Sequence, residues 1–519
     1  MDKKKNKLVL CELLICILVV CIIFILKKQL LLFETNDDQT MIDIVSGNFG
    51  ISSFYMIYSN FLYGYLLKFL YMIFNDINWY ILISTIFSII CSYLVLNSLT
   101  DYKKTFKNII VCSVLIFILY DLFSSFNYTK LAGFISVSGI LTIYDNYESA
   151  NGYFFLGLFV AFMGSLIRFE SFAIVLLFFS LLFLEKIIKN KRIIIGKSLI
   201  ILIVSLVAST SLYLINKSMF QDFNEFNKYR TNILDYSLYD NDHITISDND
   251  YKMLETWTFE DRNVFNTDYF MYLSNDNSVS IINVLKSCVV NGLYALKNYG
   301  IAILTALFCI IAIFDYHNDT KFKILTIISF LLAYFLLNYM GRVIYRAEMI
   351  LWMSLLLTLI KFTSLNKISA IIYVIAFSIM IDKQPSTEIE IYYINKEKRN
   401  ELIDYTSNNL ENIYLIDTFT SLEYFYPTLI YEIMPNNYMQ NIVLCGSYMT
   451  NHPIINYQLD KYNLISALVD CVDNQKCYLI DNKHIEIKKE YLKEHYNMNI
   501  DFIVEYESNL LKVYKLVSK

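Results

Sequence analysis

Long apolar runs fill the first 381 residues of the chain and constrain its fold more than any other feature. Hydrophobic residues make up 56% of the 519 residues, and charged residues only 18%. A chain surrounded by water alone cannot hide so much apolar surface, so lipid must solvate part of it. We expect an α-helical polytopic membrane protein with about 11 transmembrane helices, near residues 8–26, 79–99, 108–123, 129–144, 152–167, 171–184, 198–215, 299–314, 324–339, 344–359 and 368–381.

The four prolines of the chain all lie beyond Asp382, where the long apolar runs end. This change in composition predicts two parts, a transmembrane domain over residues 1–381 and a C-terminal domain over residues 382–519. In the second part, short runs typical of strands alternate with runs typical of helices, such as 486–496, which predicts a small α/β domain. The expected strands are 412–416, 442–445, 477–480, 502–506 and 511–516.

Basic residues between the apolar runs indicate the side of the membrane on which each loop lies. Cytoplasmic loops carry an excess of lysine and arginine, so the lysines from Lys3 to Lys7 place the N-terminus in the cytoplasm. Eleven crossings then put most other basic loops inside and the C-terminal domain outside the cytoplasm. This topology requires two helices within 152–184, which moves Arg168 and Glu170 from mid-membrane to the outer interface.

Two loops join the C-terminal domain on the expected outer face, a first loop over residues 29–78 and a large loop over residues 216–298. Residues 54–74 are apolar and aromatic with scattered polar residues, which is typical of a helix lying in the membrane interface. Cys471 and Cys477 could form a disulfide if this face is oxidising. The expected location is the cell membrane, with many passes.

Two adjacent carboxylates, Asp37 and Asp38, follow the first apolar run on the expected outer side. One of them can face a cavity as a general base while its neighbour supports it, or they can bind a divalent metal through their oxygens. A solvated turn at a helix end is the other interpretation. Both residues are catalytic candidates, and they are the metal candidates if a metal is used at all.

Arginines lie at the expected outer tips of later helices. Arg168 is followed closely by Glu170, and Arg342 lies four residues before Arg346. Because the planar guanidinium matches phosphate oxygens, the three arginines are candidates for binding a donor phosphate, and Glu170 for binding substrate. An Arg168–Glu170 ion pair that only closes the helix hairpin is the alternative.

The large loop contains aromatic residues beside acids and a base. Aromatic faces stack on sugar rings, while acids and amides bind hydroxyl groups, and an ordinary polar loop is the alternative. The substrate-binding candidates here are Tyr229, Arg230, Asp235, Tyr236 and Trp257.

Some function classes find no support in the sequence. The net charge of −5 gives no sign of a polyanionic partner, so we expect no nucleic-acid binding. The chain has no P-loop, dinucleotide fingerprint, HExxH or GxSxG motif. These absences argue against nucleotide-dependent work.

The order and sidedness of the motifs resemble the GT-C glycosyltransferases, and more specifically uncharacterised GT-C-like membrane proteins of low-GC Gram-positive bacteria. The resemblance covers most of the membrane part and, loosely, the C-terminal domain. The segments that carry it are Asn36-Asp37-Asp38, Ser46-Gly47, Asn78-Trp79-Tyr80, Gly164 to Phe169, Tyr229-Arg230 with Asp235-Tyr236, and Gly341-Arg342 with Arg346.

The resemblance implies a glycosyltransferase that moves a sugar, with inversion, from a polyprenyl-phosphate donor in the bilayer to a cell-envelope glycan or other acceptor on the outer face. Asp37 or Asp38 would remove the acceptor's proton. Arg168, Arg342 and Arg346 would neutralise the leaving phosphate. Some members of the class use a divalent metal and others do not, so the cofactor stays open.

Two other function classes also fit the sequence. One is a polysaccharide polymerase or lipid-linked-sugar transporter, and the other is a non-catalytic envelope assembly protein. A polysaccharide polymerase would depend on the arginines of the large loop more than on Asp37. A lipid-linked-sugar transporter would need a polar path through the spans, which contain few ionisable residues. A non-catalytic envelope assembly protein would tolerate substitution of all these residues.

Overall fold

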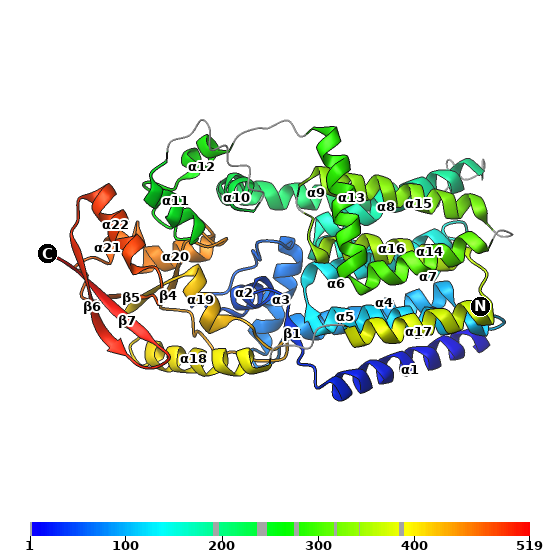
Figure 1. Ribbon diagram of the computed structural model, residues 1–519, viewed down its shortest axis with the longest axis horizontal. Coiled ribbons are helices and arrows are strands. Elements are labelled where there is room, and N and C mark those ends of the chain that lie inside the picture. The colour runs from blue at the N-terminus through cyan, green and yellow to red at the C-terminus, as the bar shows by residue number, and fades with distance from the viewer. Residues whose placement is uncertain are drawn as a thin grey trace.

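Helices make up most of the molecule (Figure 1). A bundle of roughly parallel helices fills one half, and a sheet with its helices fills the other. The first helix begins at the far end of the bundle, while the last strand ends the chain at the opposite tip. The computed structural model describes residues 3–189, 197–235, 246–274, 280–315, 319–341, 343–383 and 389–519.

Each of the eleven apolar runs expected to span the membrane coincides with a helix, to within one residue at its start. These helices are α1 (Lys3–Lys27), α4 (Trp79–Leu99), α5 (Thr105–Ser124), α6 (Tyr128–Asn146), α7 (Gly152–Ile167), α8 (Phe169–Lys189), α9 (Lys197–Met219), α14 (Gly300–Phe314), α15 (Thr320–Tyr339), α16 (Tyr345–Phe362) and α17 (Lys367–Lys383). In the described part of the chain, α1, α4, α5, α8, α9 and α15 are long and apolar enough to cross a membrane. Helix α14 with α13 (Ile281–Asn298) forms a bent pair that would add a seventh span. A helical membrane protein is therefore supported, and the count of eleven spans stays a prediction.

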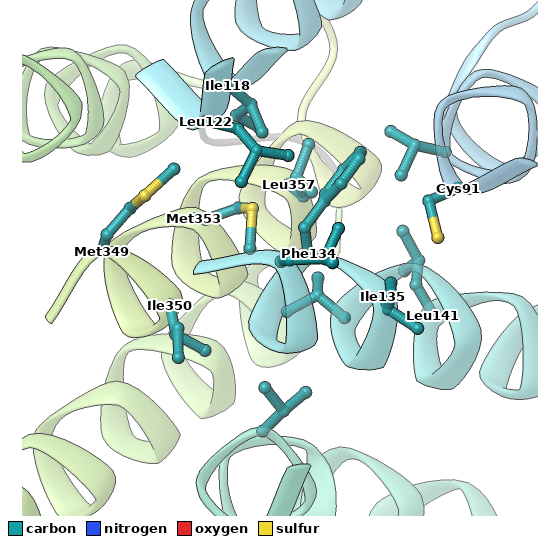
Figure 2. Packing of buried hydrophobic residues seen from close by; sticks show 14 of the residues in the cluster. Cys91, Ile118, Leu122, Phe134, Ile135, Leu141, Met349, Ile350, Met353 and Leu357 are labelled. Carbon is teal, nitrogen blue, oxygen red and sulfur yellow. The ribbon is translucent and has the colours of Figure 1, made fainter. Parts of the chain in front are cut away.

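Helix α6 lies at the centre of the bundle, where every residue from Tyr128 to Tyr144 is buried. It packs against α4, α7, α8 and α16, and Figure 2 shows its Phe134 and Leu141 among side chains of neighbouring helices. A Cβ atom at Gly139 would lie 2.6 Å from the backbone nitrogen of Ala161 in α7. Small residues let these two helix backbones approach closely, as in other membrane bundles.

The C-terminal region contains a five-stranded mixed sheet with the order β4-β3-β5-β7-β6. Strands β4, β3 and β5 are parallel, while β7 is antiparallel to both of its neighbours. All five strands lie within two residues of the predicted bounds, and Cys471 and Cys477 are buried free thiols. The elements are α18 (Ile389–Ser407), β3 (Ile413–Asp417), α19 (Thr418–Phe425), β4 (Ile442–Cys445), α20 (Pro453–Lys461), α21 (Ala467–Asp470), β5 (Cys477–Ile480), α22 (Ile485–Tyr496), β6 (Ile500–Glu507) and β7 (Lys512–Ser518).

The two loops expected on the outer face also form helices. The helix expected over 54–74 begins only at Phe61, because the side chain of Asn60 caps it by accepting from the N–H of Leu62. Residues 281–298, expected to be loop, form α13. The expected large loop thus contains helices, and its place outside the membrane stays a prediction. The other elements are β1 (Leu32–Phe33), α2 (Asp37–Ser46), α3 (Phe61–Ile73), β2 (Ser125–Phe126), α10 (Gln221–Leu234), α11 (Asp248–Glu255) and α12 (Thr267–Leu273).

The first loop and the large loop, called the outer loops after the side of the membrane expected for them, share one hydrophobic core with the C-terminal sheet. This core contains Tyr55 of the first loop, Phe259 of the large loop and Leu415 of β3. The carboxylate of Glu260 adds polar links, because it accepts from the backbone N–H of Ala467 and the backbone N–H of Leu468, at 2.9 and 2.7 Å. The C-terminal region is therefore fastened to both loops above the helix bundle.

Candidate functional site

A cavity of about 760 Å³ opens where the outer loops, the helix bundle and the C-terminal region meet. Its size matches the pockets that hold small molecules in other proteins. The charged residues in its lining are Asp37, Arg168, Glu170, Arg230, Asp235 and Arg346. Six residues expected from the sequence to act together are therefore gathered around a single cavity, although they come from four separate segments.

Asp37 is the first residue of α2 and is half-buried in the cavity wall. Its place at the helix N-terminus favours a negative charge, because the helix dipole is positive there. Tyr448 from the loop after β4 lines the same cavity. Burial raises the pKa of Tyr448 well above its usual value, and the nearby charge of Asp37 raises it further. Asp37 is thus a carboxylate inside the cavity with a neutral phenol close by.

Asp38 points away from the cavity and is fully buried. Its Oδ1 accepts from the hydroxyl of Tyr80 at 2.7 Å and from the backbone N–H of Tyr128 at 3.0 Å. Burial raises the pKa of Asp38 well above its ordinary value. Successive helix residues project in different directions, so the adjacent acids are separated. Asp38 ties α2 to α4 and α6.

Arg168 lies between α7 and α8, and several contacts hold its guanidinium in the cavity. It donates to the hydroxyl of Tyr128 and, at 2.8 Å, to the hydroxyl of Thr129. It also lies over the ring of Tyr58, with 5.9 Å from its central carbon to the ring centroid. The ion pair with Glu170 is long, at 3.9 Å. Arg168 is held mainly by the tyrosines and the threonine, so the predicted ion pair contributes little to its position.

Arg346, on the first turn of α16, lines the cavity and faces Glu34 at 3.8 Å. Behind this pair, the fully buried Lys130 lies 3.0 Å from Glu34 and 3.5 Å from Asp121. Tyr345 donates its hydroxyl to Asp121 at 2.6 Å. The charges of α5, α6 and α16 are therefore linked into one network, and Arg346 is its member at the cavity wall. Arg342 lies outside the described residues.

The large loop contributes a compact group to the cavity wall. The guanidinium of Arg230, with 3% of its side chain exposed, lies 3.6 Å from Asp235 and 5.0 Å from the ring centre of Trp257. Tyr229 points into the hydrophobic core of the outer region and does not line the cavity. Tyr236 lies outside the described residues. Three of the five candidates from this loop are therefore in the cavity wall.

Four tyrosines in the cavity wall had no signal in the sequence. Tyr58, Tyr128, Tyr213 and Tyr448 come from the first loop, α6, α9 and the loop after β4. The chain has 43 tyrosines, so composition does not distinguish these four. They lie in different local settings, two in loops and two in helices, so no common pattern marks them. Only the folded structure brings them together.

Apolar side chains from three bundle helices complete the wall. They come from α8, α15 and α16, all of which lie within the apolar bundle. The cavity thus combines charged residues from the outer segments with an apolar surface from the bundle, which suits an amphipathic ligand. The apolar lining residues in these helices and in their caps are Phe169, Ala173, Ile174, Leu177, Leu336, Leu337, Met340, Ile344, Ala347 and Ile350.

One set of metal-ligand side chains occurs elsewhere, among the residues that the structure describes. Asp417, Asp481 and His484 offer ligand atoms within 4.8 Å of one another at the end of β3 and β5. The buried ammonium of Lys488 already lies 2.9 Å from Asp417 and contacts Asp481 as well. Because one cation already balances these carboxylates, the group fits a structural ion-pair cluster better than a metal site.

Comparison of the chain with protein-family models, with curated proteins and with solved structures finds no match. Inference about function therefore rests on the chemistry of the cavity.

Proposed function

We propose that the protein is a membrane glycosyltransferase, similar in kind to the GT-C class. It would move a sugar from a polyprenyl-phosphate donor to a cell-envelope glycan or another acceptor. The observation that carries this function is the meeting of Asp37, Arg168 and Arg346 around one cavity with an apolar wall. A base, two phosphate-binding groups and a lipid-compatible surface are the parts that such a transfer needs.

In the proposed reaction, Asp37 accepts the proton of an acceptor hydroxyl as its oxygen attacks the anomeric carbon of the donor. The bond from that carbon to the phosphate oxygen breaks, and the configuration inverts. The electron pair leaves with the polyprenyl phosphate, whose negative charge Arg168 and Arg346 stabilise. Arg230, Asp235 and Trp257, which also line the cavity, would bind the acceptor.

The apolar wall supports a donor that arrives from the bilayer. Helices α8 and α15 are long and apolar enough to span a membrane, and both contribute side chains to the cavity. We infer eleven spans, a cytoplasmic N-terminus and an extracytoplasmic C-terminal region. A reporter fused after Asn36 tests this orientation. Activity of a cytoplasm-specific reporter at that position would rule out an outer-face reaction.

The decisive variant is Asp37→Asn, which keeps the size of the side chain and removes its basicity. In cells that lack the gene and express the variant, transfer should fall by about 10²–10⁴-fold, the usual contribution of a general base. The envelope fraction should lose one sugar while the lipid-linked donor accumulates. Asp76→Asn, an exposed carboxylate of the same loop, is the matched control. Normal envelope sugar at normal protein level in Asp37→Asn would refute the assignment.

A divalent metal remains compatible with this reaction, and Asp37 is the carboxylate that would contact it in the cavity. Treating the purified protein with EDTA distinguishes a metal-dependent enzyme from a metal-independent one. A metal-independent enzyme keeps its transfer rate, whereas a metal-dependent one loses it and recovers it when the ion is returned.

A further inference from the structure

Helix α13 presents an apolar face that no other part of the described chain covers. Ile281, Leu285, Val289 and Leu293 follow one another at four-residue spacing and are each 52–64% exposed. At 100° per residue, these side chains form one stripe along the helix. Its charged residues are the lysines Lys286 and Lys297, which lie along one edge of the stripe.

An adjacent side of α13 is fixed to the bundle. Val284 and Ala295 are buried, and α13 packs against α15. The side-chain amide of Asn291 donates to Asn338 of α15 at 2.8 Å. The exposed stripe is therefore held in a definite direction relative to the bundle.

A sharp bend separates α13 from the next helix. The axes of α13 and α14 differ by 100°, with the break at Tyr299. The helices of the bundle run roughly along one direction, and α13 crosses their ends near the sheet-bearing half (Figure 1). Tyr299 also packs against Tyr345, with ring centroids 4.4 Å apart, and Tyr345 precedes Arg346 of the cavity. The bend thus lies at the level of the cavity.

We propose that α13 lies in the plane of the membrane, at the boundary between headgroups and acyl chains on the side of the cavity. The apolar stripe would rest on acyl chains, and Lys286 and Lys297 would meet lipid phosphates. A helix with an apolar face and flanking lysines is typical of this position, with burial of about 5–10 Å.

The occupant inferred here is lipid, and the inference does not depend on sugar transfer. If the Asp37→Asn experiment refuted sugar transfer, the in-plane position of α13 would still stand. If α13 were shown not to lie in the membrane plane, the proposed sugar transfer would still stand. A second copy of the chain, or insertion of the α13–α14 pair as a re-entrant segment, are the outcomes that would contradict it.

Tryptophan quenching in lipid vesicles tests the position of α13. Full-length Val289→Trp is reconstituted into vesicles of phosphatidylcholine and phosphatidylglycerol, with bromine either near the headgroup or near the chain end. The signal added over wild-type protein should be lost with shallow bromine and largely kept with deep bromine. Leu285→Trp should behave in the same way, which guards against a local effect of one substitution.

Asn283→Trp, on another face of the same helix, is the matched control and should escape both quenchers. Stronger quenching of Val289→Trp by deep bromine would overturn the in-plane position in favour of a re-entrant one. No quenching by either lipid would show that water or a second copy covers the stripe, and this result would overturn the inference as well.

Discussion

Removing the ammonium of Lys130 should destabilise the protein strongly. This side chain is completely buried and lies 3.0 Å from Glu34 and 3.5 Å from Asp121. It also donates to the backbone carbonyl and the hydroxyl of Ser125, at 3.1 and 2.7 Å. Lys130→Met keeps the length of the side chain but removes the charge that balances two carboxylates. Breaking a buried ion pair by deleting one partner costs about 3–5 kcal/mol.

A double-mutant cycle separates the ion pair from other effects of substitution. Asp121→Asn alone should cost less, because Lys130 keeps its contact with Glu34. In the double variant Lys130→Met with Asp121→Asn, one of the two unbalanced carboxylates is gone, so the loss should be smaller than the sum of the single losses. Coupling energies of about 0.5–3 kcal/mol are usual for residues in contact.

The free energy of unfolding is measured by SDS titration of the protein in mixed micelles, with circular dichroism as readout. The control is Lys321→Met, because Lys321 is 68% exposed and pairs with Glu185 at the surface. Such surface pairs contribute about 0–1 kcal/mol. Equal effects of Lys130→Met and Lys321→Met, or strictly additive losses in the cycle, would refute the reasoning that burial makes the Lys130 network costly to break.

Three further outcomes are expected. Burial raises the pKa of Glu260 to about 7, so the folded state keeps a proton that the unfolded state releases. The free energy of unfolding should therefore fall as pH rises from about 4.5 to about 7. In unfolding titrations, Glu260→Gln should make this pH dependence weaker. Asp38→Asn should cost no more than about 1–3 kcal/mol of unfolding free energy, because the carbonyl of the new amide can keep both hydrogen bonds and only its NH2 group lacks a partner. Sugar-transfer assays should then find activity well above that of Asp37→Asn, which should lose about 10²–10⁴-fold. Trp257→Ala removes the ring beside Arg230 and should raise KM for the acceptor with little change in kcat, so a kcat loss alone would contradict an acceptor role.

The candidate site was predictable as a set of residue types, and only in part as a geometry. The charges that line the cavity stood out in the sequence because charged residues are rare beside apolar runs. The sequence did not tell whether Asp37 or Asp38 is the better candidate for the general base, because two adjacent residues give no sign of which one faces the cavity. The Lys130 network gave no signal either, since a lysine near the start of an apolar run also fits an exposed helix end.

Local patterning determined the elements of this protein. Apolar runs long enough to form helices, and short β-branched runs after Asp382, predicted the eleven bundle helices and the five strands, because each signal is contained within one segment. Helix α13 was not predicted because polar residues interrupt its apolar run in the sequence. Its apolar face forms only when the segment is helical. The cavity was decided by tertiary structure alone: Asp37, Arg168, Arg230 and Arg346 meet because the outer loops and the sheet share a core above the bundle. Contacts between segments so far apart in the chain depend on packing, which no single stretch of sequence specifies.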